Sequence, residues 1–107
     1  MVEELRPGSF ELVVHRIRMS ERALNLKGGR LWELIQITPE RWRCSQYPDV
    51  AHCWVVGIIG HQCLYLNEVE DGFNWGHFSS WGEVDSYGWE QDEVHDALNR
   101  LADALDS

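Results

Sequence analysis

Residues 52–69 read HCWVVGIIGHQCLYLNEV, and the predicted fold rests on this stretch. His52–Ile59 is almost wholly apolar and rich in β-branched side chains, which is typical of a strand that is covered on both faces. Gly60-His61 suits a two-residue turn with glycine at its first central position. Gln62–Val69 then returns as the partner strand. The stretch therefore predicts an antiparallel hairpin at the centre of a sheet.

Strand patterns also occur on both sides of this hairpin. Residues 10–17 alternate and contain β-branched side chains, which is typical of a strand. Residues 31–37 form a second strand pattern, which leads into a turn over residues 38–41 with proline at its second position. Residues 20–27 leave two alternatives open, a short helix that Ser20 caps or an irregular edge. The strands expected besides the hairpin are Phe10–Ile17, Leu31–Ile37, Trp42–Gln46, Phe73–Phe78 and a short one near Glu83–Asp85.

The clearest helix is Glu90–Leu105. Its apolar side chains fall on one helical stripe, formed by Val94, Ala97, Leu98, Leu101 and Leu105. Short turns between successive strands favour a meander. We therefore expect an α+β fold, an antiparallel five- to six-stranded meander sheet with one C-terminal amphipathic helix packed on one face. The residues expected to be buried are Val55, Ile58, Leu64, Leu66, Leu98 and Leu101.

Length and composition favour one small domain. The chain has 107 residues, and we expect a single domain over 1–107, with residues 1–9 as a loose lead-in. Glu3 and Glu4 stand where a secretory signal would be basic, and the near-apolar run Cys53–Gly60 is too short to span a bilayer. We therefore expect a cytoplasmic protein with no membrane partner, whose three cysteines are reduced.

Charge is segregated along the chain. It carries 18 acidic and 9 basic residues, for a net charge of −9. Residues 1–43 hold eight of the basic residues and six of the acidic ones, whereas residues 44–107 hold one basic and twelve acidic residues. Such a field repels nucleic acid and anionic lipid and attracts basic partners. The alternative is that the charge serves solubility alone.

Spacing argues against a metal centre and against cysteine chemistry. In the expected hairpin register Ile58 faces Cys63, and Cys53 faces Glu68. Cys53 and Cys63 are then separated by five residues along the strand, which places their sulfur atoms about 16 Å apart. No nucleophile elbow, phosphate loop or zinc-protease motif occurs in the sequence. We therefore predict no catalytic residues, no metal site and no cofactor.

The most suggestive stretch is 67–90, NEVEDGFNWGHFSSWGEVDSYGWE, in which acidic and aromatic residues alternate in clusters. Aromatic anchors inside an acidic rim are typical of an electrostatically steered protein interface. The alternative is that these aromatic residues belong to the core, since large side chains help to fill a small one. The predicted partner-binding residues are Glu68, Glu70, Asp71, Trp75 and Trp81.

The C-terminal half of the chain resembles a known class of proteins. Its Glu70-Asp71-Gly72-Phe73 turn, its Trp81-Gly82-Glu83-Val84 segment and its closing amphipathic helix make it similar to bacterial toxin-immunity proteins. The resemblance implies a protein that neutralises a toxin by binding it, commonly through an acidic surface.

Three functions follow as hypotheses. The first is a non-enzymatic domain that binds a basic protein, of the immunity type. The second is a small-ligand or carbohydrate-binding module, in which flat rings would stack on sugars; its candidate residues are Trp75, Trp81, Tyr87 and Trp89. The third is an enzyme with an unfamiliar site, which would require a pocket with convergent polar groups.

Overall fold

A computed structural model of the chain describes residues 9–44, 52–67, 72–85 and 93–105. Three helices and five strands occur in this part of the chain. They are α1 (Phe10–Glu21), α2 (Leu26–Ile35), β1 (Gln36–Cys44), β2 (His52–Ile59), β3 (Gln62–Asn67), β4 (Gly72–His77), β5 (Glu83–Val84) and α3 (Val94–Leu105). The fold is α+β, as predicted, but the described residues contain three helices, where the sequence predicted one and left a short helix at residues 20–27 open.

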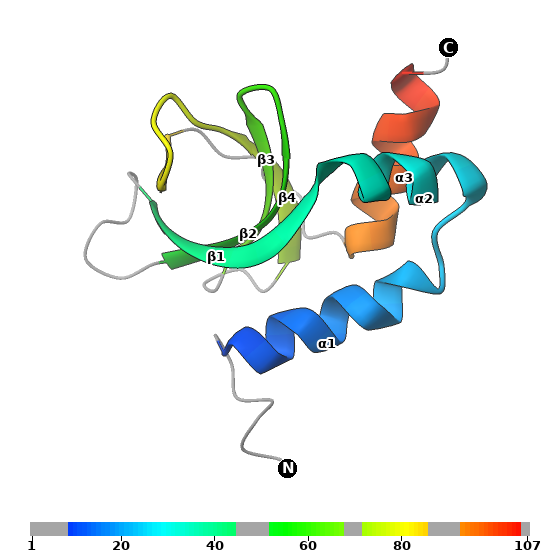
Figure 1. Cartoon of the computed structure of the whole chain (residues 1–107), viewed down its shortest axis with the longest axis horizontal. Helices are drawn as coiled ribbons and strands as arrows, with labels where there is room; N and C mark the ends of the chain where they lie inside the picture. Colours follow the sequence, from blue (N-terminus) through cyan, green and yellow to red (C-terminus); the bar gives the residue numbers. More distant parts are fainter. Residues whose placement is uncertain (1–8, 45–51, 68–71, 86–92, 106–107) are drawn as a thin grey trace.

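The strands form one mixed sheet in the order β4-β3-β2-β1-β5. Neighbours from β4 to β1 are antiparallel, and β5 pairs with the end of β1 in parallel. The predicted purely antiparallel meander is therefore wrong at this edge, because β5 returns to β1 from far along the chain. Figure 1 shows the sheet curling into a half-barrel with the helices outside it.

Each face of the sheet has its own apolar core. Helix-side residues form one cluster of mostly aliphatic side chains, here called the helix-side core: Val13, Ile17, Leu31, Trp32, Ile35, Val56, Leu64, Leu66, Phe73, Val94, Ala97, Leu98 and Ala102. The inner face of the curl forms a second cluster, here called the inner core: Trp42, Cys44, Cys53, Val55, Cys63, Tyr65, Phe78 and Val84. Alternate strand positions point to opposite faces, so the sheet supplies both cores.

Helix α1 occupies the segment for which a strand, Phe10–Ile17, was predicted. Ser9 caps the helix, since its hydroxyl accepts a hydrogen bond from the Leu12 N–H at 3.1 Å. Val13, Ile17 and Ser20 are the buried residues of α1, at the i, i+4, i+7 spacing of one helix face. The strand prediction is wrong because tertiary packing selects this helical period over the local β propensity.

Helix α2 and strand β1 replace the predicted hairpin of Leu31–Ile37 with Trp42–Gln46. Asn25 caps α2, accepting a hydrogen bond from the Gly28 N–H at 2.7 Å, and the helix runs on to Ile35. The chain then enters β1 directly, and the turn predicted at 38–41 lies inside that strand. The predicted hairpin is therefore wrong, although residues 42–44 lie in a strand as predicted, and residues 45–46 of that prediction lie outside the described residues.

Gly28 explains how α2 packs despite its two glycines. A Cβ at Gly28 would clash with Oδ1 of the Asn99 side chain on α3, whereas a Cβ at Gly29 would meet nothing within 4 Å. The Asn99 side chain thus occupies the space that a side chain at position 28 would need. The same Oδ1 of Asn99 accepts a hydrogen bond from the backbone N–H of Asn25 at 3.1 Å, so the absence of a side chain at Gly28 leaves room for this bond.

The central hairpin is confirmed, with a change of register. Gly60 lies in the turn with a φ of 59°, and Ile58 pairs with Cys63 as predicted. An irregularity between Val55 and Gly57 shifts the pairing by one residue, so Cys53 pairs with Asn67. A bulge of this kind is invisible to a register counted from the turn.

Two cysteines are joined, contrary to the prediction of reduced thiols. Cys44 at the end of β1 forms a disulfide with Cys53 at the start of β2, and both are fully buried in the inner core. The antiparallel pairing of β1 with β2 brings the two side chains together. Cys63 remains a free thiol.

Helix α3 confirms the predicted C-terminal helix from Val94 to Leu105. Glu93 directly precedes the helix, and residues 90–92 of the prediction lie outside the described residues. Among the residues predicted to be buried, Val55, Leu64, Leu66 and Leu98 are buried, and Ile58 and Leu101 are half-buried. Leu105 was placed on the same stripe but is 62% exposed, because the helix extends beyond the elements that cover it.

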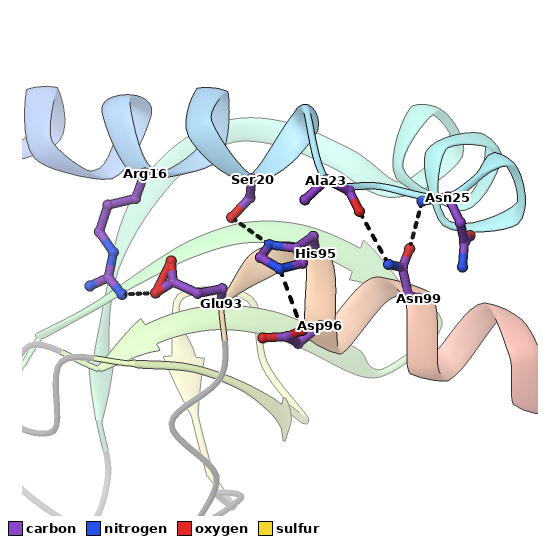
Figure 2. A network of polar contacts seen from close by, with 8 residues as sticks. All are labelled: Arg16, Ser20, Ala23, Asn25, Glu93, His95, Asp96 and Asn99. Atoms are coloured by element: carbon purple, nitrogen blue, oxygen red, sulfur yellow. Dashed lines mark hydrogen bonds and ion pairs between the residues drawn. The ribbon is translucent and has the colours of Figure 1, made fainter.

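Polar contacts also hold α3 against α1. Figure 2 shows Glu93, which directly precedes α3, and His95 and Asn99 of α3 pointing towards α1 and the turn that follows it. Arg16 donates to Glu93 at 2.7 Å, and Nδ2 of Asn99 donates to the Ala23 carbonyl at 3.4 Å. These contacts flank the helix-side core and fix the position of α3.

Candidate partner-binding site

An aromatic cluster lies at one end of the inner core. Trp42 of β1 and Phe78, just after β4, are buried at 2% and 7% exposure, and Trp81 packs on both of them with 60% of its surface exposed. The ring centroids of Trp42 and Trp81 are 5.0 Å apart with a tilt of 59°, and those of Phe78 and Trp81 are 6.1 Å apart, edge to face. Trp81 therefore has one side fixed on the core and another in solvent.

Glu40 joins the two indoles of this cluster. Its Oε1 accepts a hydrogen bond from Nε1 of Trp42 at 3.1 Å and another from Nε1 of Trp81 at 3.0 Å. Glu40 and Trp42 are two residues apart on β1, so both point to the inner face of the curl. One exposed carboxylate thus orients both rings.

A tight turn presents Trp81 at its corner. The Glu83 N–H donates to the Ser80 carbonyl at 3.3 Å, and Gly82 between them has a φ of 101°. A positive φ at the third position is the requirement of a type II turn, which glycine meets without strain. The Gly82 carbonyl also accepts from the Arg43 N–H of β1 at 2.9 Å, so the turn is tied to the sheet.

The base of this turn is closed by a His–Asp pair. Nδ1 of His77 lies 2.9 Å from Oδ1 of Asp85, and the Ser79 N–H donates to Oδ2 of the same carboxylate at 2.9 Å. The hydrogen bonds from His77 and then Ser79 lower the pKa of Asp85. His61 lies beside His77, with its Nδ1 3.1 Å from the Phe78 carbonyl oxygen. The turn that carries Trp81 is therefore held at both ends.

The two predicted partner-binding residues that the structure describes, Trp75 and Trp81, do not share a surface. Trp81 is exposed, as its predicted role requires. Trp75 packs against the helix-side core, so it lies on the opposite face of the sheet from Trp81. Its buried Nε1 has no hydrogen-bond partner among the described residues. Glu68, Glu70 and Asp71 lie outside the described residues. The prediction that Trp75 belongs to this surface has no support from its position.

Sequence reasoning missed Glu40 and Trp42, which complete the site. The available signal was their spacing, because two residues apart on a strand means the same face. The turn predicted at residues 38–41 concealed that signal by ending the strand too early. Their pairing with Trp81, forty residues further along the chain, had no local signature.

Other arrangements in the molecule resemble catalytic groups without the geometry of one. Ser20, His95 and Asp96 follow in hydrogen-bonding order, but both separations are 3.4 Å and Ser20 is only 2% exposed between two helices. Burial raises the pKa of the Cys63 thiol to about 12, so Cys63 is a poor nucleophile at neutral pH. These groups contribute to packing.

Within the described ranges, no three His, Cys, Asp or Glu side chains are grouped closely enough to hold a metal ion. The same part of the chain has no helix with the length and apolar character needed to cross a membrane. An open pocket of about 560 Å³ lies over the bond from Nε1 of Trp32 to Glu21, and its lining mixes acidic, basic and apolar side chains. It holds no convergent set of reactive groups.

Comparison with known proteins finds no matching protein family, no matching curated protein and no matching solved structure.

Proposed function

We propose that this chain is a non-enzymatic protein-binding domain that contacts a basic partner through Trp81. One observation carries the proposal: Trp81 is 60% exposed yet held by two ring contacts, one hydrogen bond and a closed turn. An exposed indole that merely sat on a surface would need no such support. A ring that is already oriented loses little conformational entropy on binding, and tryptophan is enriched among interface hot spots.

Charge supports a basic partner. The carboxylates of Glu40 and Asp85 are exposed next to the Trp81 turn, and that of Glu83 is half-buried within it. The whole chain adds a net charge of −9. Such a field raises the association rate of a cationic protein and is screened by salt.

The finer proposal is an inhibitor of the immunity type, which would neutralise a basic toxin by occupying its surface. It rests on the acidic charge and on the resemblance of the Trp81-Gly82-Glu83-Val84 segment to such proteins. In this mechanism the protein performs no chemistry. Trp81 anchors the complex, and the surrounding carboxylates steer the toxin to it.

The test is binding to the basic proteins encoded beside its gene, measured by surface plasmon resonance. Trp81→Ala should raise the dissociation rate about tenfold or more, because a central anchor is lost. Leu34→Ala is the matched control, since Leu34 is 84% exposed on α2 and should have no effect. Equal affinities for both variants and the unmodified protein would reject the Trp81 surface.

The carbohydrate alternative has one supporting observation, the flat exposed ring of Trp81. Among its other candidates, Trp75 packs on the helix side, and Tyr87 and Trp89 lie outside the described residues. A sugar would gain nothing from the negative field around this ring. Binding of neutral glycans that is lost in Trp81→Ala, with no binding of basic proteins, would favour this alternative.

A further inference from the structure

We propose that Trp81 and Glu40 together form a receptor for one arginine side chain of the partner. The inference rests on the proposed function and specifies the chemistry that the site recognises. An arginine receptor requires two groups in suitable positions: a flat ring on which the guanidinium plane can stack and a carboxylate oxygen that accepts from its N–H groups. The structure provides both next to each other.

The carboxylate of Glu40 has unused capacity. Both indole N–H groups donate to its Oε1, and no donor in the described part of the chain contacts its Oε2. Because two fixed indoles hold Oε1, the group is oriented before any ligand arrives. Glu40 is exposed, so Oε2 can accept a hydrogen bond from a partner.

The ring of Trp81 has unused capacity as well. Elsewhere in the molecule arginines already cover aromatic rings: Arg16 lies 5.3 Å from the centroid of Phe73, and Arg41 lies 6.0 Å from that of Trp54. No cation of the described residues covers Trp81, although it is the most exposed of the described tryptophans. Its solvent-facing side is therefore available for cation–π contact.

Arginine fits this pair better than lysine. A guanidinium is planar, so it can stack on the indole face while its edge donates to a carboxylate at the rim of the same ring. A lysine ammonium is compact and strongly hydrated, and it has no planar group that could stack on the ring while it donates to the carboxylate. The pair should therefore discriminate between two side chains of equal charge.

The experiment compares an oligo-arginine and an oligo-lysine peptide of equal length by isothermal titration calorimetry at physiological salt. The unmodified protein should bind the arginine peptide about tenfold more tightly. Glu40→Gln should reduce that ratio to near one. Glu33→Gln is the matched control: Glu33 is also exposed, on α2, and this variant removes the same charge while leaving the ratio unchanged.

A second variant separates the two contacts and guards against misfolding. Trp81→Phe keeps a stacking ring but removes the N–H that orients Glu40, so an intermediate ratio is expected. Each variant is first checked for an unchanged thermal melt. Equal affinity of the unmodified protein for both peptides would overturn the arginine receptor, and so would a ratio that Glu40→Gln leaves unchanged. Basic-protein binding that is lost in Trp81→Ala would still uphold the proposed function in either case.

Discussion

The two faces of the sheet are built in different ways. The helix-side core is a continuous layer of mostly aliphatic side chains, into which three helices and three strands pack. The inner core is smaller and uses a disulfide, a free thiol and large aromatic rings to close the curl. Among the described residues, the segment from Phe78 to Val84 is the part of the chain that packs over the inner core.

This difference predicts that the two faces of the sheet have different roles. Aliphatic layers between helices and a sheet contribute most of the hydrophobic stabilisation of a small domain. A face closed by rings and short turns can leave one ring in solvent at little cost to folding. We therefore expect changes on the helix side to alter stability, and changes at the Trp81 end to alter binding.

The largest expected effect is on the helix side. Leu98→Ala removes a fully buried side chain and should lower the free energy of unfolding by about 2–5 kcal/mol. Trp81→Ala removes a mostly exposed ring and should cost less, about 1 kcal/mol. Urea melts of the two variants measure the contrast. Equal losses would mean that the inner core is as important for stability as the helix layer.

Reduction of the disulfide should have the next largest effect. Closing the short loop between Cys44 and Cys53 restricts the unfolded chain, which corresponds to about 2–3 kcal/mol for a loop of this length. Urea melts with and without a strong reductant test this. An unchanged midpoint would show that the bond between β1 and β2 is dispensable, and that the inner core closes through its rings alone.

The glycine pair of α2 gives a matched test of the helix crossing. Gly28→Ala places a methyl group against Asn99 and should cost about 1–3 kcal/mol. Gly29→Ala meets open space and should stabilise the helix by about 0.5–1 kcal/mol. Thermal melts should therefore move in opposite directions. Two shifts of the same sign would contradict the close contact between Gly28 and the Asn99 side chain.

How much of this fold is readable from the sequence depends on how local each interaction is. The β2–β3 hairpin was predicted because its strands are adjacent, apolar and joined at Gly60. The C-terminal helix was predicted because its stripe is long. Helix α1 was missed because Val13, Val14 and Ile17 satisfy both a strand and a helix pattern, and only packing in the helix-side core selects between them.

The site was predictable only in part for the same reason. Trp81 stood out because it lies in a stretch of acids and aromatics. Glu40 and Trp42 reach it only when β1 is nine residues long and β5 pairs with its end, and both conditions arise from contacts across the fold. The parallel pairing of Arg43 with Glu83 joins segments forty residues apart, which no local pattern reveals.

The smallest expected effect concerns pH at the base of the Trp81 turn. The pKa of Asp85 is lowered below its ordinary value of 3.8 by hydrogen bonds from His77 and Ser79. A lowered folded-state pKa stabilises the protein above that value, and the contribution is lost as the pH falls through the folded pKa. Asp85→Asn should therefore show a shallower loss of melting temperature in acid. An identical acid profile would show that this pair contributes nothing to folding.

The closeness of Trp42 and Trp81 has an optical consequence. Two indoles 5.0 Å apart and tilted by 59° couple their electronic transitions, so they should produce a paired signal in circular dichroism that isolated indoles lack. A ligand that settles on Trp81 or pulls Glu40 away from the two N–H groups changes that coupling. The protein thus contains its own spectroscopic reporter, and occupancy of the site can be followed without attaching a label.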